Sequence, residues 1–338
     1  MRLYCGIDLH ASNHYLVVQG PDRKVIFERR LGNELVRVLE ALEPYREALE
    51  GIAVESTYNW YWLVDGLMEA GYRVHLVNTS AVKPYEGLKH RDDRHDARWL
   101  AHLLELGILP MGYIYNKQDR PLRDLLRRRA FLVRKRTSHL LALRAVYERE
   151  TGQRVKTREI QRWTQRQVET LVEDPRVALN LSTLLCIGRV LGAQIQRIEK
   201  RVLAEAKLRP EFQLLQTVGG IGRILALTIM YEVGDIGRFS KVGRFASYSR
   251  CVESRHTSDG KKKGAGNKRN GNPYLSWAFS EAAHFARRYE PRAERFYARK
   301  AARAHRLVAS RALANKLARA CYYILRDQVP FDAKKAFG

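Results

Sequence analysis

Four carboxylates occupy positions that could form a metal site. Two of them end apolar strands, and the other two lie on one face of an expected helix. Asp8 ends an apolar strand expected at residues 3–8, and Glu55 ends the apolar run 51–55. A carboxylate among apolar neighbours is unfavourable unless it is paired or binds a metal ion. Asp93 and Asp96 are three residues apart at the start of an expected helix, so both project from one face. Four such oxygen ligands suit Mg²⁺ or Mn²⁺, which would polarise a scissile phosphate.

Two neighbours of these acids need a separate interpretation. Asp92 adjoins Asp93, but only Asp93 shares a helix face with Asp96, so we expect Asp92 to cap the helix. His10 follows Asp8 by two residues and therefore lies on the same strand face. Histidines at such positions are more often structural or phosphate-facing, and we leave His10 out of the ligand set.

Short strands and amphipathic helices alternate over the first 110 residues and must position the acids. Strands are expected at 3–8, 14–19, 24–29, 51–55 and 72–78, and helices at 35–42, 60–70 and 92–106. The order of three strands followed by helix, strand, helix, strand and helix is that of the RNase H-like α/β fold. We expect this unit to span residues 1–112.

From about residue 121 the pattern changes to long helices. Leucine, valine and tyrosine recur at near-heptad spacing between 122 and 147, and a second helix is expected at 184–208. A helical hairpin or coiled-coil segment over 113–210 would pair subunits. A basic helix packed on its own domain explains the pattern equally well. Its exposed faces carry candidate nucleic-acid ligands, Arg128, Arg134 and Lys135.

Residues 211–338 are expected to form a mainly helical unit. Gly220 and Gly222 precede a helix at 224–231, and such a loop offers backbone N–H groups to phosphate. The loop resembles the helix-hairpin-helix element that grips DNA backbones, although close helix packing explains the glycines too. Residues 257–272 are polar, glycine-rich and basic, which predicts a surface loop.

Charge is the informative bulk property of the chain. There are 61 Lys and Arg against 36 Asp and Glu in 338 residues, a formal charge of +25. The excess is concentrated, with 12 basic and 2 acidic residues between 287 and 326. This distribution predicts nucleic-acid binding. The four cysteines form no CxxC pair, which fits a reducing cytoplasm, and no apolar run of roughly 20 residues predicts a membrane span.

Motifs in the N-terminal and C-terminal parts of the chain resemble those of one known family. Gly6-Ile7-Asp8, Glu55-Ser56-Thr57 and Asp93-Arg94-His95-Asp96-Ala97 are similar to the Asp-Glu-Asp-Asp set of the transposases of the insertion-sequence family called, in words, one hundred and ten, closest to its eleven-eleven subgroup. The runs 218–222 and 257–264 resemble the second domain of that family.

The resemblance implies a fold, a reaction mechanism and partners that the residues alone do not indicate. It implies a RuvC-like N-terminal half and a C-terminal serine that forms a covalent phosphoserine with DNA. It further implies a bridge RNA that pairs with donor and target DNA, and a dimer or tetramer in which the acids of one subunit meet the serine of another. By this likeness the chain is a transposase of the bacterial cytoplasm, associated with the nucleoid.

Ser258 is the position that matches the family's nucleophile, and Ser254 is the alternative. Basic residues that follow Ser258 are candidate phosphate clamps: Lys261, Lys262, Lys263, Lys268 and Arg269. Two other functions stay open. The first is a metal-dependent nuclease or junction resolvase that uses water in place of serine, and the second is a nucleic-acid-binding scaffold without catalysis.

Overall fold

The computed structural model describes residues 1–82, 92–206, 209–253, 256–258, 261–264 and 270–338. The chain divides into two compact units, Met1–Lys117 and Gln118–Gly338. The second unit contains residues 118–210 of the expected helical middle together with the expected C-terminal part.

The first unit is built on a mixed five-stranded sheet. Its strands are β1 (Leu3–Leu9), β2 (Asn13–Gln19), β3 (Val25–Gly32), β4 (Leu49–Glu55) and β5 (Val74–Val77). They lie in the order β3-β2-β1-β4-β5. The first three pair antiparallel, whereas β4 is parallel to both β1 and β5. This sheet is compatible with the RNase H-like α/β domain that the order of elements predicted.

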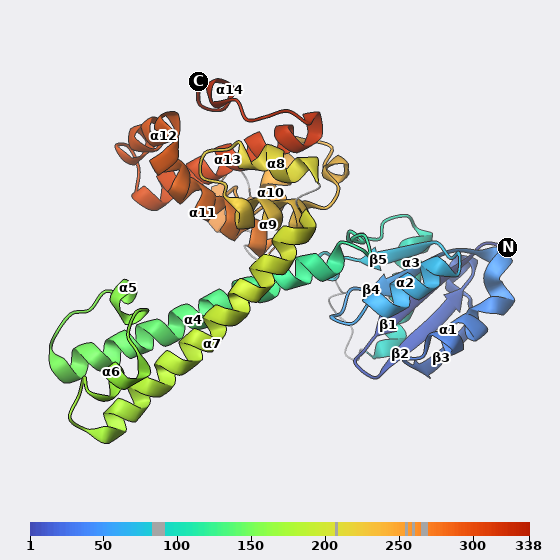
Figure 1. Cartoon of the computed structure of the whole chain (residues 1–338). Coiled ribbons are helices and arrows are strands. Elements are labelled where there is room, and N and C mark those ends of the chain that lie inside the picture. The colour runs from blue at the N-terminus through green and yellow to red at the C-terminus, as the bar shows by residue number, and fades with distance from the viewer. Residues whose placement is uncertain (83–91, 207–208, 254–255, 259–260, 265–269) are drawn as a thin grey trace. The chain divides into compact units, whose positions relative to one another are not determined.

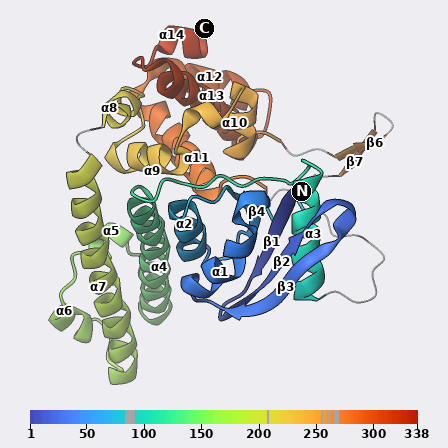
Figure 2. The same ribbon diagram turned by 90° about the vertical axis from the view of Figure 1, so that its right-hand side faces the viewer.

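Helices cover both faces of the sheet, and alternation along β1 decides which residues each helix meets. Leu3, Cys5, Ile7 and Leu9 share a core with two helices on one face, α1 (Leu35–Leu42) and α2 (Tyr61–Glu69). The even-numbered residues point to the other face, where α3 (Asp93–Glu105) packs. Figure 2 shows α3 behind the strands of this unit. Asp8 therefore faces α3.

Two long helices form a hairpin in the second unit. These are α4 (Arg120–Thr151) and α7 (Pro175–Ala206), and Figure 1 shows them side by side, with the short helices α5 (Thr157–Ile160) and α6 (Gln165–Glu169) near the tip. At the tip, Leu140 and Leu143 share a core with Leu181 and Leu185. The heptad-like spacing is thus used within one chain.

The composition of α7 bears on the expectation that the chain has no membrane span. Among the described residues, α7 is the one helix that is long and apolar enough to cross a membrane by length and composition, with an 18-residue window of mean hydropathy 1.4. The sequence of this helix is interrupted by polar residues and has no uninterrupted apolar run of that length. About a third of the window, 33%, is buried, and part of α7 packs against α4.

The rest of the second unit is mainly helical, as expected. Its helices are α8 (Pro210–Gln216), α9 (Arg223–Val233), α10 (Val242–Tyr248), α11 (Pro273–Tyr289), α12 (Pro291–Ala301), α13 (Arg306–Asp327) and α14 (Ala333–Phe337). The buried helix α9 lies in its core. The bases of α4 and α7 join this core through Leu122, Leu126, Val202 and Ala206.

The segment expected as a surface loop contains secondary structure. Its described residues form an antiparallel hairpin of β6 (His256–Ser258) and β7 (Lys261–Gly264). Figure 2 shows the two strands standing apart from the helices. Lys261 and Lys263 are exposed, in agreement with the expected surface position. The two short strands were not predicted, because three- to four-residue strands rich in lysine and glycine carry no alternating apolar pattern.

Candidate active site

Two of the predicted acids are neighbours across parallel strands. Ile7 of β1 pairs with Val54 of β4, so the next residue on each strand is an acid, Asp8 and Glu55. Parallel strands bring their carboxyl ends to the same edge of a sheet. Asp8 is buried and Glu55 half-buried. The sheet thus places both carboxylates together, as the sequence predicted.

A glycine allows α3 to reach these acids. Gly6 lies on the same face of β1 as Asp8, and a Cβ atom there would overlap the Ala97 carbonyl oxygen and lie 2.8 Å from the Ala101 backbone nitrogen. Because Asp93 precedes Ala97 by one helical turn, the close approach carries Asp93 to the end of β1. Asp92 is the N-cap, and its side chain accepts a hydrogen bond from the His95 backbone N–H at 2.8 Å. The predicted cap is confirmed.

A histidine joins the acids. Nε2 of His10 lies 3.3 Å from Oδ2 of Asp8 and 3.1 Å from Oδ1 of Asp93. One ligand atom from each of these three residues lies within 4.8 Å of the others. His10 was not among the predicted ligands, but it lies within the cluster. Its position two residues after Asp8 was the available signal.

Arg30 is a second residue that the sequence did not single out. Its Nη2 donates to Oδ2 of Asp93 at 2.6 Å, and its Nη1 donates to Asn13 at 3.0 Å. Although burial acts in the opposite direction, the hydrogen bond from Arg30 and the charge of His10 lower the pKa of Asp93. Asp93 is therefore held as a carboxylate.

The pKa of Asp8 is shifted in the opposite direction, upward. Burial, a hydrogen bond shared with Glu55 and the negative charge of Glu55 raise the pKa of Asp8 to about 8, with a smaller contribution from Asp96. His10 acts in the opposite direction. Since the charges of Glu55 and Asp96 both act on Asp8, all four predicted acids belong to one electrostatic cluster.

The donor set fits a divalent metal ion. Nε2 of His10 lies between the two carboxylates, at 3.3 Å from Asp8 and 3.1 Å from Asp93. Crowded buried carboxylates are costly, and a bound cation offsets that cost. Oxygen ligands favour magnesium or manganese, while the imidazole widens the range of metals that would bind.

The candidate nucleophile belongs to the other unit. Ser258 is half-buried at the end of β6 and pairs with Lys261 of β7. Lys261 and Lys263 are exposed, and of the side chain of Lys262 nothing is described. The alternative Ser254 and the candidate clamps Lys268 and Arg269 lie outside the described residues.

The other predicted nucleic-acid ligands differ in their surroundings. A Cβ at Gly220 would lie 2.7 Å from the Ala282 carbonyl oxygen, so this glycine allows close packing on α11, the alternative weighed for it. Gly222 caps α9 with open space around it. Two of the three basic residues predicted on α4, Arg128 and Lys135, flank the half-exposed ring of Phe131 at 5.6 Å, and Arg134 is exposed near them.

A mixed sheet with a carboxylate cluster at the ends of its central strands is compatible with an RNase H-like domain. Two family models match this chain. The first, a DEDD transposase model, covers residues 5–151, and the second, described as Transposase IS116/IS110/IS902 family, covers residues 212–298. The chain belongs to this transposase family, as the resemblance predicted.

Two curated relatives agree with this assignment. The chain is 28% identical over 280 residues, 80% of each protein, to a "Probable family 20 transposase" of Pseudomonas aeruginosa. It is 25% identical over 260 residues to the "Transposase for insertion sequence element IS1111A" of Coxiella burnetii, which covers 75% of this chain and 69% of the relative. Transposases bind DNA, and they cleave and transfer its strands.

Proposed function

We propose that this transposase cuts and rejoins donor and target DNA through a serine-linked intermediate at a magnesium- or manganese-dependent site. The observation that carries the proposal is the cluster of Asp8, His10 and Asp93 ligand atoms within 4.8 Å of one another. It lies at the ends of two parallel strands in a chain of a DNA-cleaving family.

Asp8, Glu55, Asp93 and Asp96 would hold the metal, and His10 would complete or position this set. A divalent cation supplies Lewis-acid stabilisation of the charge that develops on a scissile phosphate. The protein's own part is to hold the carboxylates in place. Gly6 allows α3 to approach β1, and Arg30 donates a hydrogen bond to Asp93 when no cation is bound.

Ser258 would act as the nucleophile, with Ser254 as the alternative. Its Oγ loses a proton and forms a bond to the scissile phosphorus, while the bond from phosphorus to the leaving strand's oxygen breaks and that oxygen takes up a proton. A hydroxyl of the partner DNA strand then attacks the phosphoserine, and the serine regains its proton. Because one phosphate ester replaces another in each step, no external energy source is needed. The exposed Lys261 and Lys263 on the hairpin are suited to contact the phosphate backbone.

A bridge RNA would choose the DNA sites by base pairing, which leaves the protein to recognise backbone and shape. The formal charge of +25 and the exposed cations of α4 support binding of two nucleic acids. Acids and serine belong to different compact units, which is compatible with a dimer or tetramer whose subunits share sites. The reaction would take place in the bacterial cytoplasm, at the nucleoid.

Covalent trapping tests the proposal. Purified protein is mixed with Mg²⁺, RNA from the non-coding flank of the element and end-labelled donor and target DNA, and the products are separated on a denaturing gel. Wild type is compared with Ser258→Ala, Asp93→Asn and the matched control Ser310→Ala, a half-buried serine on α13. We expect a protein–DNA adduct in wild type and in the control that both site variants lose.

Other outcomes assign other mechanisms. If DNA is cleaved without an adduct and this cleavage persists in Ser258→Ala, hydrolysis by water, as in a junction resolvase, would replace the serine mechanism. An adduct that survives Ser258→Ala but not Ser254→Ala would move the nucleophile. Full activity of Asp93→Asn would contradict the metal site.

A further inference from the structure

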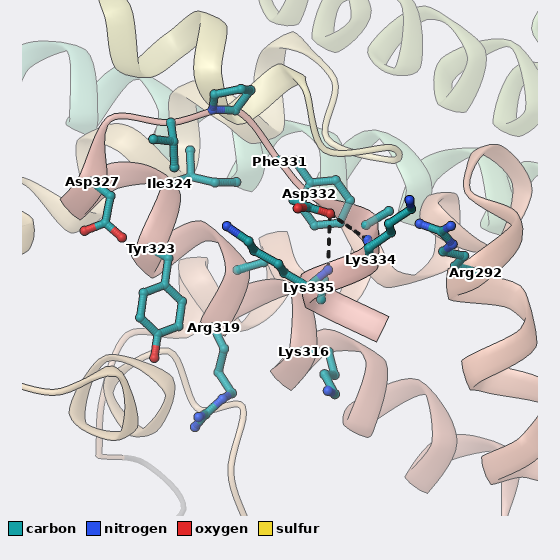
Figure 3. Close-up of a pocket in the computed structure, with 15 residues that line it drawn as sticks. Arg292, Lys316, Arg319, Tyr323, Ile324, Asp327, Phe331, Asp332, Lys334 and Lys335 are labelled. Carbon is teal, nitrogen blue, oxygen red and sulfur yellow. Dashed lines mark hydrogen bonds between the residues drawn. The ribbon is translucent and has the colours of Figure 1, made fainter. Parts of the chain in front are cut away.

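The C-terminal helices line a half-open cavity that the proposed strand-transfer chemistry does not use. It lies beside α12 and α13 and the segment that leads into α14, with a volume of about 980 Å³. Figure 3 shows the side chains around it. Five of them are cations: Arg292, Lys316, Arg319, Lys334 and Lys335.

Two acids in the cavity wall, Asp327 and Asp332, offset part of the charge of Lys334 and Lys335 but also have other hydrogen-bond partners. Asp327 accepts two hydrogen bonds from Arg326, at 2.6 and 2.9 Å. Asp332 caps α14, and it accepts from the backbone N–H groups of Lys334 and Lys335 at 2.8 and 3.2 Å. In the described part of the chain, none of the five cations lies within 4.0 Å of a carboxylate oxygen.

Such a cluster is unfavourable by itself. Like charges that surround one cavity repel one another, and the repulsion is largest where side chains are partly shielded from water, as Arg292 and Lys316 are. A polyanion would offset this repulsion. Lysine binds phosphate as a point charge, and arginine binds it through paired N–H groups.

The remaining wall of the cavity is apolar. Tyr323, Ile324, Val329 and Phe331 line it, and Tyr323 is 40% exposed. Arg326 covers the Tyr323 ring at 4.9 Å. Exposed aromatic rings beside cations are typical of sites for unpaired nucleic-acid strands, because the face of an unpaired base is free to stack. A duplex buries those faces in its own stack.

We propose that this cavity binds a single-stranded segment of nucleic acid, with the five cations on its phosphates and the aromatic wall against a base. The volume is at the upper end of the range for small-molecule sites, roughly 300–1,000 Å³, which leaves room for more than one nucleotide. DNA and RNA share the phosphodiester chemistry that the cations recognise.

A second cavity gives the strand a direction. Lys316 lines both cavities, and the second, of about 780 Å³, also has Lys300 and Arg311 in its wall. The same wall contains residues 250–253, which precede the β6–β7 hairpin in the chain, and Asn315 holds the Cys251 carbonyl at 3.2 Å. A strand bound in the first cavity is thereby led toward the segment that carries Ser258.

Binding of short oligonucleotides to the full-length protein tests this site. A labelled twelve-nucleotide strand, as DNA and as RNA of equal sequence, is titrated at several KCl concentrations and followed by fluorescence anisotropy. The test variant is Arg319→Gln/Lys334→Gln/Lys335→Gln. Its matched control is Arg299→Gln/Arg303→Gln/Arg306→Gln, three exposed arginines of the same helical region outside both cavities.

We expect the test variant to bind about tenfold more weakly than the control variant, with a salt slope smaller by about 2, since each phosphate contact contributes about 0.7 for a single strand. If the test variant binds RNA, DNA or both more weakly than the control variant does, the result supports the site and identifies the kind of strand that it binds. Equal binding by the two variants would overturn the proposal, as would equal competition by a poly-glutamate peptide.

A second measurement does not depend on charge removal. A photo-crosslinking phenylalanine derivative is introduced at position 323, and the protein is irradiated with the labelled strand. An adduct at this position, and none with the derivative at the exposed Tyr289, is the expected result. Equal adducts at both positions, or none at 323, would contradict the site. Because neither readout requires cleavage, the result is independent of the serine mechanism.

Discussion

Gly6 of β1 lies directly against Ala97 of α3, so close that a methyl group at residue 6 would overlap the Ala97 carbonyl oxygen. Backbone thus meets backbone without an intervening side chain. The contact sets the distance between the strand that carries Asp8 and the helix that carries Asp93 and Asp96. A residue without chemistry of its own thereby fixes the geometry of the acidic cluster.

Gly6→Ala is expected to separate α3 from β1. Neither atom that the methyl group would meet belongs to a flexible side chain, so we expect a loss of stability of about 1–3 kcal/mol in the first unit and a loss of metal binding. Urea unfolding and Mn²⁺ titration measure the two effects. Gly32→Ala is the control, because its new Cβ would make only ordinary contact, 3.6 Å from Glu34. Unchanged metal affinity in Gly6→Ala would contradict this role.

Asp92 and Asp93 are adjacent but are expected to behave differently. Asp92→Ala removes the N-cap of α3, which costs about 1 kcal/mol of stability but leaves the carboxylate cluster intact. Asp93→Asn keeps the helix and removes a charge that contacts His10 and Arg30. DNA cleavage assays should find Asp92→Ala active and Asp93→Asn inactive. The reverse order of activities would mean that Asp92 belongs to the site.

Arg30 is expected to compete with a bound metal ion for Asp93. The pair is partly exposed, so its contribution is small, and Arg30→Gln should strengthen Mn²⁺ binding only about two- to fivefold. Isothermal titration calorimetry measures this change. Arg37→Gln, which breaks a 3.1 Å pair with Glu34 in the same unit, should leave the affinity unchanged. Weaker binding by Arg30→Gln would show that the arginine orients the ligand more than it competes.

A buried ion cluster in the second unit predicts a pH dependence of stability. Glu232 of α9 is almost fully buried and accepts hydrogen bonds from Arg127 at 2.6 and 2.8 Å, from Arg123 at 3.2 Å and from Asn272 at 2.7 Å. Although burial acts in the opposite direction, these partners lower the pKa of Glu232 below its usual value of 4.5. The folded protein therefore holds this proton less tightly than the unfolded chain does.

The ionised Glu232 carboxylate stabilises the folded state above about pH 4.5. This stabilisation is lost as the pH falls through the lowered pKa of Glu232 in the folded protein. Glu232→Gln should be less stable than wild type by about 3 kcal/mol at pH 7, with the difference narrowing below pH 4.5. Denaturant unfolding followed by circular dichroism at pH 7, 5, 4 and 3 measures this. A difference that stays constant down to pH 3 would contradict it.

The positions of the strands and of the acids along the chain could be predicted because they depend on local pattern. Asp8 and Glu55 each end an apolar run, and parallel pairing then makes them neighbours whatever the rest of the chain does. The helix start at Asp93 follows from a capping residue and the spacing of apolar side chains. These features need only the alternation of residues along strands and helices.

The parts that the sequence did not predict depend on contacts between distant residues. Arg30 is 63 positions from Asp93, and nothing in its own segment indicates that partner. His10 required a choice between a structural and a ligand role, which only the position of Asp93 decides. The cavity at Arg292 and Lys334 arises where α12, α13 and α14 meet, and a charge count identifies the region but not its shape.

The central claim is that the acidic cluster binds a divalent cation, and electron paramagnetic resonance of Mn²⁺ tests it most directly. The free-ion signal is followed as the nucleic-acid-free, full-length protein is added, for wild type, for Asp8→Asn and for Asp65→Asn, a control acid in α2. We expect wild type and the control to remove the signal, Mg²⁺ to restore it by competition, and Asp8→Asn to leave it largely unchanged. Equal uptake of Mn²⁺ by wild type and Asp8→Asn would contradict it.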